Sequence, residues 1–287
     1  MFNKRHIVRT IAPTVSILAL SFTAACGSGQ STASNSTDSD DITQQTYKPG
    51  KLTIATGQPA YEPWVMNDKP ESGEGYEAAV AYAVADKLGF KKSDVVWTRT
   101  AFDTAIAPGA KDWDFNIQQF GITDERKKAV DFSSSYYNDS QSVVVKKDSK
   151  FANATKVSDL KDATVGVMVG TLAYDYAKAN IKDDIQTFND DAALAQALDA
   201  GQIDVLVTST VECVYMVQSE QVKDSKVLGR LPDSEDKSGM GIVLPKDSKL
   251  TAAVTKAVDD LNADGTIKKL QDKWLAEYTT DLTELKK

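Results

Sequence analysis

Short apolar runs alternate with longer amphipathic segments along most of this 287-residue chain. Runs such as Leu52–Thr56 and Ile203–Thr208 have the length and composition of buried strands. Between the runs, apolar residues recur at helical spacing, as in Glu74–Leu88, which Gly89 brings to an end. Strands separated by helical stretches predict mainly parallel sheets with helices on both faces.

The strand–helix order restarts once, which predicts two α/β lobes rather than one continuous sheet. The order of Lys51–Leu88 is repeated at Thr164–Ala179, and no short repeat is present. The other predicted strands are Val95–Thr98, Trp113–Gln119, Ser140–Lys146, Thr164–Met168, Ile185–Phe188 and Gly241–Leu244. The other predicted helices are Leu172–Ala179, Asp190–Ala200, Val211–Gln218 and two near the C-terminus that reach Trp274.

The N-terminus has the pattern of a secretory signal. Basic residues precede the apolar run Ile11–Phe22, which is shorter than the roughly 20 residues needed to span a bilayer. Small residues and then Cys26 follow, which resembles a bacterial lipobox, although Thr23 stands where leucine is usual. We expect residues 1–25 to be removed, Cys26 to be lipidated, and residues 26–49 to form a polar tether. The alternative is a free Cys26 or a disulfide to Cys213, the only other cysteine.

The charge of the chain argues against nucleic acid or anionic lipid as a partner. The formal net charge is −8, and residues 1–25 contribute three basic residues and no acid, so the remainder carries −11. The sole histidine, His6, lies in the segment expected to be removed. The remaining chain therefore lacks Ser-His-Asp chemistry and the commonest transition-metal ligand, and we expect no cofactor or metal.

One arginine follows a predicted strand directly. The segment Phe115–Tyr137 runs from an apolar strand through Thr123 to Arg126. A twisted α/β sheet opens its ligand crevice at such strand ends, and a guanidinium fits a carboxylate with two parallel hydrogen bonds. From these residues alone an alternative remains open, in which Thr123 caps a helix and Arg126 is a solvated surface charge.

Six motifs in a fixed order together resemble the extracellular solute-binding protein family 3, which binds polar amino acids and supplies ABC importers. The resemblance covers about residues 50–280. The motifs are Gly50–Ile54, Ala60–Trp64, Gly75–Glu77, Ile122–Ser133, Val165–Thr171 and Asn262–Trp274.

The resemblance implies a type II periplasmic-binding-protein fold, with two α/β lobes joined by two hinge strands and the ligand in the cleft. The hinge strands would lie near Ser142–Lys147 and Gly239–Leu244. Lobe 1 would comprise residues 50–143 plus 244–287, and lobe 2 residues 144–243. Ligand contacts made by both lobes would favour the closed state.

The resemblance also assigns the residues that hold the ligand carboxylate. Arg126 matches the arginine that grips it, and Thr171 matches the residue whose backbone N–H, at a helix start, meets it from lobe 2. Gly121 and Gln119 match positions that touch the same ligand. Gln118, next to Gln119, is expected to point to the opposite face of the strand.

Aromatic side chains are expected to wall the rest of the pocket. Tyr61, Trp64 and Phe102 match the aromatic positions around the ligand side chain. Glu77 matches an acidic family position, but its place at a helix start favours helix capping over ligand contact.

The sequence departs from the family at the groups that should bind the ligand ammonium. Ser209 and Gln58 stand where acids are usual. Burying an ammonium without a carboxylate is costly, so something must compensate. Three alternatives stay open: an acid among Glu62, Glu74 and Glu212 takes part; Ser209 and Gln119 act as neutral acceptors; or the ligand is not a standard α-amino acid.

The resemblance implies a monomeric lipid-anchored binding protein on the extracellular face of the bacterial cytoplasmic membrane. It would hand a small polar amino acid or related carboxylate to the permease subunits of an ABC importer, without catalysis. One alternative is a secreted dehydratase of the prephenate or arogenate type, with Glu62 or Glu212 as proton donor. Another is a ligand-sensing lobe for a separate receptor.

Overall fold

The structure is a computed structural model that describes residues 41–279 and 282–287. It contains two five-stranded sheets, ordered β2-β1-β3-β10-β4 and β7-β6-β8-β5-β9. The strands are β1 (Leu52–Thr56), β2 (Val95–Arg99), β3 (Phe115–Asn116), β4 (Val130–Tyr137), β5 (Gln141–Lys146), β6 (Val165–Met168), β7 (Gln186–Phe188), β8 (Val205–Ser209), β9 (Ser225–Arg230) and β10 (Met240–Pro245). The α-helices are α1 (Tyr76–Lys87), α2 (Phe102–Ile106), α3 (Leu172–Asn180), α4 (Asp191–Asp199), α5 (Thr210–Gln218), α6 (Thr251–Ala263) and α7 (Thr266–Trp274). Two separate α/β lobes are therefore present, as predicted.

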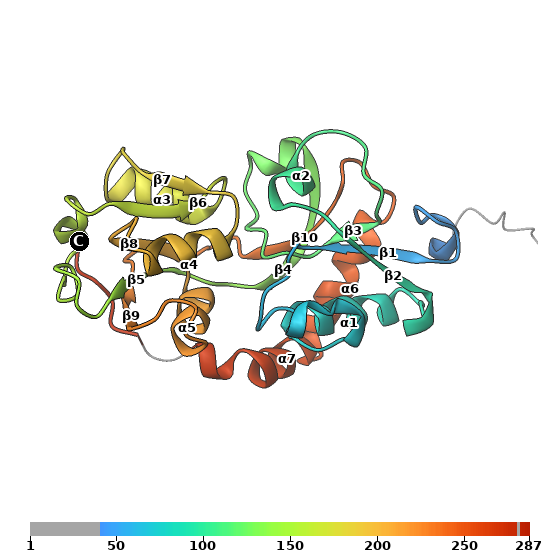
Figure 1. Ribbon diagram of the computed structural model, residues 1–287. Coiled ribbons are helices and arrows are strands. Elements are labelled where there is room, and N and C mark those ends of the chain that lie inside the picture. Colours follow the sequence, from blue (N-terminus) through green and yellow to red (C-terminus); the bar gives the residue numbers. More distant parts are fainter. Residues whose placement is uncertain (1–40, 280–281) are drawn as a thin grey trace, which may run out of the picture. The chain divides into compact units, whose positions relative to one another are not determined.

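The first sheet is buried on both faces. All five residues of β1 are buried, as expected for a continuous apolar run inside a layered α/β unit. Helices α1, α6 and α7 lie together on one side of this sheet and α2 lies on the other (Figure 1). The main core of this lobe joins Ile54 and Phe115 of the strands to Val80 and Val254 of the helices.

The second sheet has the same layered organisation. Val143, Val165 and Val207 of its strands pack with Ala173 and Ala177 of α3 on one side. Leu206 packs on the other side with Leu194 and Leu198 of α4 and Met216 of α5. Each lobe therefore has a core of its own, and the loops and helix starts at the sheet ends are available for a binding site.

The prediction of mainly parallel sheets is wrong. Strand β1 pairs in parallel with β2 and β3, and β6 with β7 and β8. Strand β10, however, is antiparallel to β3 and β4, and β5 is antiparallel to β8 and β9. Strands β5 and β10, which directly follow the two lobe crossings, run in the direction opposite to their neighbours. Each sheet is therefore mixed.

The chain passes between the sheets at residues 138–140 and 231–239. The strands predicted as hinges near Ser142–Lys147 and Gly239–Leu244 correspond to β5 and β10, each of which lies within one sheet.

The C-terminal end does not follow the predicted assignment of residues 244–287 to lobe 1. Two backbone β-bridges join this end to lobe 2: Glu284 pairs with Arg230, and Lys286 pairs with Lys156. Leu285 is buried in the lobe 2 core, and this burial accounts for the placement of the end.

The folded body begins before residue 49, the predicted end of the tether. Asp41 caps a short helical turn at Ile42–Gln44, and the backbone N–H of Tyr47 donates to Asp114 at 2.6 Å. Residues 41–49 are thus attached to lobe 1 instead of belonging to a tether, whereas residues 1–40, including Cys26, lie outside the described residues. None of the helices in the described part of the chain is long and apolar enough to cross a membrane.

Three elements were not predicted, and one strand is shorter than expected. Helix α2 and strands β4 and β9 carry serine, lysine or aspartate among their apolar residues, which weakens the pattern. Strand β3 ends at Asn116, although the apolar pattern predicted a strand as far as Gln119.

Candidate functional site

A cavity of about 90 Å³ lies at the ends of the strands, bounded by residues of both lobes. This volume is several times the roughly 10–15 Å³ that a single water needs, so the cavity has room for a small solute. All of the residues predicted to contact a ligand border it: Tyr61, Trp64, Phe102, Gln119, Gly121, Arg126, Thr171 and Ser209. Their roles toward a ligand remain predictions.

Arg126 is held at the boundary of the two lobes. Thr123 accepts a hydrogen bond from the Arg126 backbone N–H, as the capping interpretation expected. The side chain is nevertheless no free surface charge, because Nη1 donates to the Gly121 carbonyl at 2.6 Å and Nη2 donates to the Gly170 carbonyl of lobe 2 at 2.8 Å. Burial lowers the pKa of Arg126 from its ordinary value, and Asp236 partly opposes this effect. The guanidinium has further N–H donors beyond these two bonds.

Thr171 begins helix α3 from the lobe 2 side of the cavity. Its hydroxyl accepts from the Tyr174 backbone N–H at 3.2 Å and donates to the Met168 carbonyl at 2.8 Å, which fixes the turn between β6 and α3. A helix N-terminus presents free amides and a positive dipole end, so an anion is favoured at this wall.

The predicted aromatic residues take three different positions. Phe102 stacks on Phe120 with ring centroids 4.7 Å apart and lies 5.4 Å below the Arg126 guanidinium. The Tyr61 hydroxyl accepts from the Ala192 backbone N–H of lobe 2 at 3.4 Å, and burial raises its pKa. The indole N–H of buried Trp64 donates to Glu212 Oε2 at 3.3 Å.

The two glutamines both border the cavity, so the expectation that only one of them faces it is wrong. The strand ends at Asn116 and Gln119 has φ of 50°, so strand alternation no longer applies there. Gln119 donates from its backbone N–H to Glu77 Oε1 at 2.7 Å and from its side-chain amide to Glu77 Oε2. The Gln118 Oε1 atom is buried without a partner.

Glu77 does not cap helix α1, in contrast to the prediction. The helix starts after Gly75 with no side-chain cap. Glu77 is fully buried and accepts from Gln119 and from the Tyr136 hydroxyl. Burial raises its pKa to about 7. The role of Glu77 is to hold the backbone of Gln119 in the cavity wall.

Gly121 of lobe 1 lies close to Leu172 of lobe 2 and to Asp236 of the crossing segment. A Cβ at this position would lie 2.6 Å from Leu172 Cδ1 of lobe 2 and 2.9 Å from Asp236 Oδ2. A side chain here would therefore displace the side chains of Leu172 and Asp236 that pack against Gly121.

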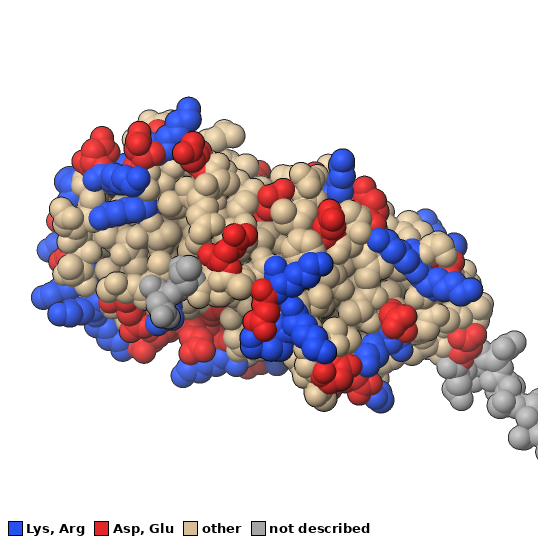
Figure 2. All heavy atoms as spheres, turned by 90° about the horizontal axis from the view of Figure 1, so that it is seen from below, with Lys and Arg blue, Asp and Glu red and all other residues tan. Residues whose placement is uncertain are grey.

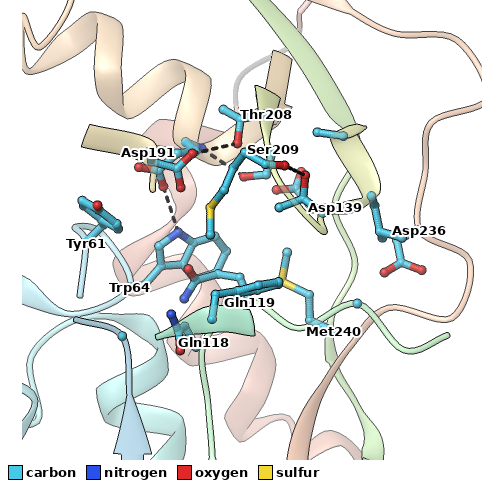
Figure 3. A pocket seen from close by; sticks show the side chains of 18 of the residues that line it. Tyr61, Trp64, Gln118, Gln119, Asp139, Asp191, Thr208, Ser209, Asp236 and Met240 are labelled. Carbon is cyan, nitrogen blue, oxygen red and sulfur yellow. Dashed lines mark hydrogen bonds between the residues drawn. The ribbon is translucent and has the colours of Figure 1, made fainter. Parts of the chain in front are cut away.

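Carboxyl groups that the sequence analysis did not identify line the cavity beside Ser209 (Figure 3). Asp139 follows β4, and burial raises its pKa to about 6 although Ser209 and nearby backbone N–H groups stabilise the carboxylate. Asp191 begins α4 and accepts from Thr208 at 3.4 Å. Its pKa is raised to about 6 by burial and by the adjacent charge of Asp190.

Glu212 is the one member of the suggested trio Glu62, Glu74 and Glu212 that lines the cavity. Burial and the charges of Asp191 and Asp139 raise its pKa well above the ordinary value. Ser209 caps helix α5 by accepting from the Glu212 backbone N–H at 3.3 Å, which places both residues at one wall.

The acids missed by sequence reasoning had weak local signals. Asp139 lies in a polar crossing segment, and Asp191 follows Asp190, which caps helix α4 by accepting from the Ala193 backbone N–H. Asp236, also in a crossing segment, borders the cavity near Arg126. The one signal available in the sequence was that each of the two crossing segments contains an acid, Asp139 in the first and Asp236 in the second.

Within the described residues, no group of His, Cys, Asp and Glu is arranged to hold a metal ion. Cys213 is a free, buried thiol with a raised pKa, and its Sγ donates to the Thr208 carbonyl. It is a small packed residue in the lobe 2 core.

Two mixed α/β lobes with a small cavity bounded by both define the class of two-lobed ligand-binding proteins. The chain belongs to the bacterial extracellular solute-binding proteins, family 3, whose family model matches residues 52–277. Its fold is the type II periplasmic-binding-protein fold that the resemblance implied.

Among curated relatives, the L-cystine-binding protein TcyJ of Escherichia coli (strain K12) is 29% identical over 223 residues, covering 77% of this chain and 81% of the relative. Among solved structures, an ancestral arginine-binding protein bound to arginine is 31% identical with a TM-score of 0.67, covering 78% of this chain and 98% of that one. The ancestral amino acid-binding protein AncCDT-1, a precursor of cyclohexadienyl dehydratase, is 30% identical with a TM-score of 0.65, covering 79% and 96%.

Proposed function

We propose that this protein captures an amino acid between its two lobes outside the cytoplasm and delivers it, as a monomer, to the permease of an ABC importer. The supporting observation is that one cavity contains both a guanidinium, at Arg126, and carboxyl groups with unpaired oxygens, at Asp139 and Glu212. A zwitterionic amino acid has the complementary pair of charges. Its carboxylate would meet Arg126 and the start of α3 at Thr171.

These carboxyl groups would replace the acids that other family members use to bind the ligand ammonium. Ser209 and Gln58 leave no acid at the usual positions, but Glu212, Asp139 and Asp191 surround the same space. Their oxygens would bind the ammonium group, with Ser209 as a neutral neighbour. Tyr61, Trp64 and Phe102 would wall the ligand side chain.

A thermal-shift screen of the purified protein against single L-amino acids and simple carboxylates tests this function. A ligand that binds only the folded state raises the melting temperature by mass action. A shift that increases with the concentration of at least one amino acid is expected. Equal melting points with and without every compound would contradict the proposal.

The attachment to the membrane is a further part of the proposal. Family members are extracellular binding proteins, and Cys26 would carry the lipid after removal of residues 1–25. Metabolic labelling with a fatty acid should mark the wild type and the Cys213→Ser control but not Cys26→Ser. Labelling of Cys26→Ser would exclude this anchor.

A dehydratase activity is a second candidate, because Glu212 is a buried carboxyl at the cavity wall and burial raises its pKa well above the ordinary value. A protonated acid beside a leaving hydroxyl is what dehydration requires. Glu62, the other suggested donor, does not border the cavity; it accepts from the Asn67 backbone and the Tyr215 hydroxyl. Incubation with prephenate or arogenate, followed by detection of aromatic product, distinguishes the enzyme from the binding protein.

A further inference from the structure

The described lining of the cavity has an unequal balance of charge. Arg126 is its sole lysine or arginine, whereas four acids border the same space: Asp139, Asp191, Glu212 and Asp236. Closing a small cavity around several carboxylates is unfavourable unless cations neutralise them, because water is excluded from the site.

Three of these acids have an oxygen without a hydrogen-bond partner: half-buried Asp236, at Oδ2, and the more deeply buried Glu212 and Asp139. Glu212 is 4% exposed and its Oε1 has no hydrogen-bond partner, since Trp64 occupies Oε2. Asp139 is 7% exposed and its Oδ2 is likewise without a partner. Buried acceptors of this kind are normally satisfied, which indicates that a donor is supplied from outside the chain.

A single ligand ammonium group cannot neutralise the carboxyl groups that border the cavity. An α-amino acid with a neutral side chain brings one carboxylate for Arg126 and a single positive charge for Asp139, Asp191 and Glu212. At least one buried carboxyl would then have to remain protonated or unpaired in the closed state. A second cation on the ligand would leave one fewer of these carboxyl groups without a counter-charge.

We infer that the bound amino acid carries a second positive charge on its side chain, and that Glu212, Asp139 and Asp191 bind its two cationic ends. The inference rests on the proposed function and names the ligand class of that site: α-amino acids with a basic side chain. It disfavours L-cystine, because a second ligand carboxylate would find no second basic residue in the described lining.

Titration calorimetry on the wild-type protein with L-arginine, L-citrulline and L-cystine tests the inference. Citrulline has nearly the shape of arginine but no side-chain charge. We expect arginine to bind about 100-fold more tightly than citrulline, a factor within the range of close charge pairs. Citrulline or cystine binding as tightly as arginine would overturn the inference while leaving amino-acid capture intact. If no amino acid binds the folded protein, both the function and the inference fail.

Two isosteric variants locate the effect. Glu212→Gln and Asp191→Asn should each lower arginine affinity at least about tenfold and change citrulline affinity much less. Asp190→Asn is the matched control: it removes the same charge one residue away, outside the lining, and asparagine keeps the helix cap. Equal losses for Asp190→Asn and Asp191→Asn would contradict direct contact. If a variant does not fold, the comparison of arginine with citrulline and cystine on the wild-type protein still tests the inference.

Discussion

The indole N–H of Trp64 donates to Glu212 Oε2 at 3.3 Å, which joins the segment before α1 in lobe 1 to helix α5 in lobe 2. The Tyr61 hydroxyl and the Arg126 guanidinium make two further bonds between the lobes, to Ala192 and Gly170. Residues of the cavity wall thus also hold the lobes together. Changes to them should alter ligand binding through closure as well as through direct contact.

Trp64→Phe removes the donor to Glu212 and keeps most of the aromatic packing against Tyr76 and Tyr137. A hydrogen bond to a charged group contributes about 1.5–3 kcal/mol, so we expect a loss of about tenfold or more in amino-acid affinity, measured by calorimetry. Trp274→Phe is the control, because Trp274 packs on the lobe 1 core away from the cavity. Equal effects of the two substitutions would refute the closure role of Trp64.

Arg126→Lys keeps the positive charge and removes the planar fork. We expect affinity to fall at least about 30-fold, since lysine cannot reproduce paired bonds to a carboxylate or reach both the Gly121 and Gly170 carbonyls. The melting point without ligand should change little, because neither lobe core contains Arg126. Lys128→Ala, in the same turn with 71% of its side chain exposed, is the control. Full affinity in Arg126→Lys would show that Arg126 does not bind the ligand carboxylate through its paired N–H donors.

The sequence predicted the framework well where apolar runs are continuous and buried. Strand β1 matches its predicted bounds, Leu52–Thr56, because every residue in it is buried. The turn at Thr171 was predictable from the strand–glycine–threonine–helix order. The prediction that Arg126 lies in the binding site depended on the family resemblance, since its local pattern equally fits a surface turn.

The acids could not be predicted from local pattern. Asp139 and Asp191 are separated by some fifty positions and meet only because β4 crosses into β5 beside the start of α4. Gln119 was misjudged because a positive φ breaks the strand alternation. These features depend on tertiary packing, which hydrophobic periodicity does not encode.

Gly121→Ala should weaken ligand binding by hindering closure. The added Cβ would lie 2.6 Å from Leu172 Cδ1, a distance that real contacts do not reach, so either the Leu172 side chain or lobe 2 as a whole must shift. We expect a lower affinity in calorimetry with an unchanged melting point of the ligand-free protein. Shortening the opposing side chain in Gly121→Ala/Leu172→Ala should restore part of the affinity. A double variant no better than the single one would rule out this steric explanation.

The stability of the ligand-free protein should depend on pH through Asp139 and Glu77. Their pKa values are raised by burial, to about 6 and about 7, so the folded state binds more protons than the unfolded state above about pH 4. For these two groups the stability is therefore highest below about pH 4 and falls as pH rises from about 4 to about 7. Asp139 alone contributes at most about 3 kcal/mol to this fall. Urea unfolding between pH 4.5 and 8 measures it, and Asp139→Asn should flatten the slope.

Binding of a cationic amino acid should show the opposite dependence on pH. The ligand favours the ionised carboxyls, so affinity should rise as pH increases through about 6, where Asp139 and Asp191 lose their protons. Glu212, whose pKa is raised further by the facing charges of Asp191, Asp139 and Glu77, should extend the rise to higher pH. Calorimetry at pH 6 in buffers of different ionisation enthalpy should detect protons released on binding. Affinity that is constant from pH 5 to 8, with no proton release, would mean that these carboxyls do not bind the ligand cation.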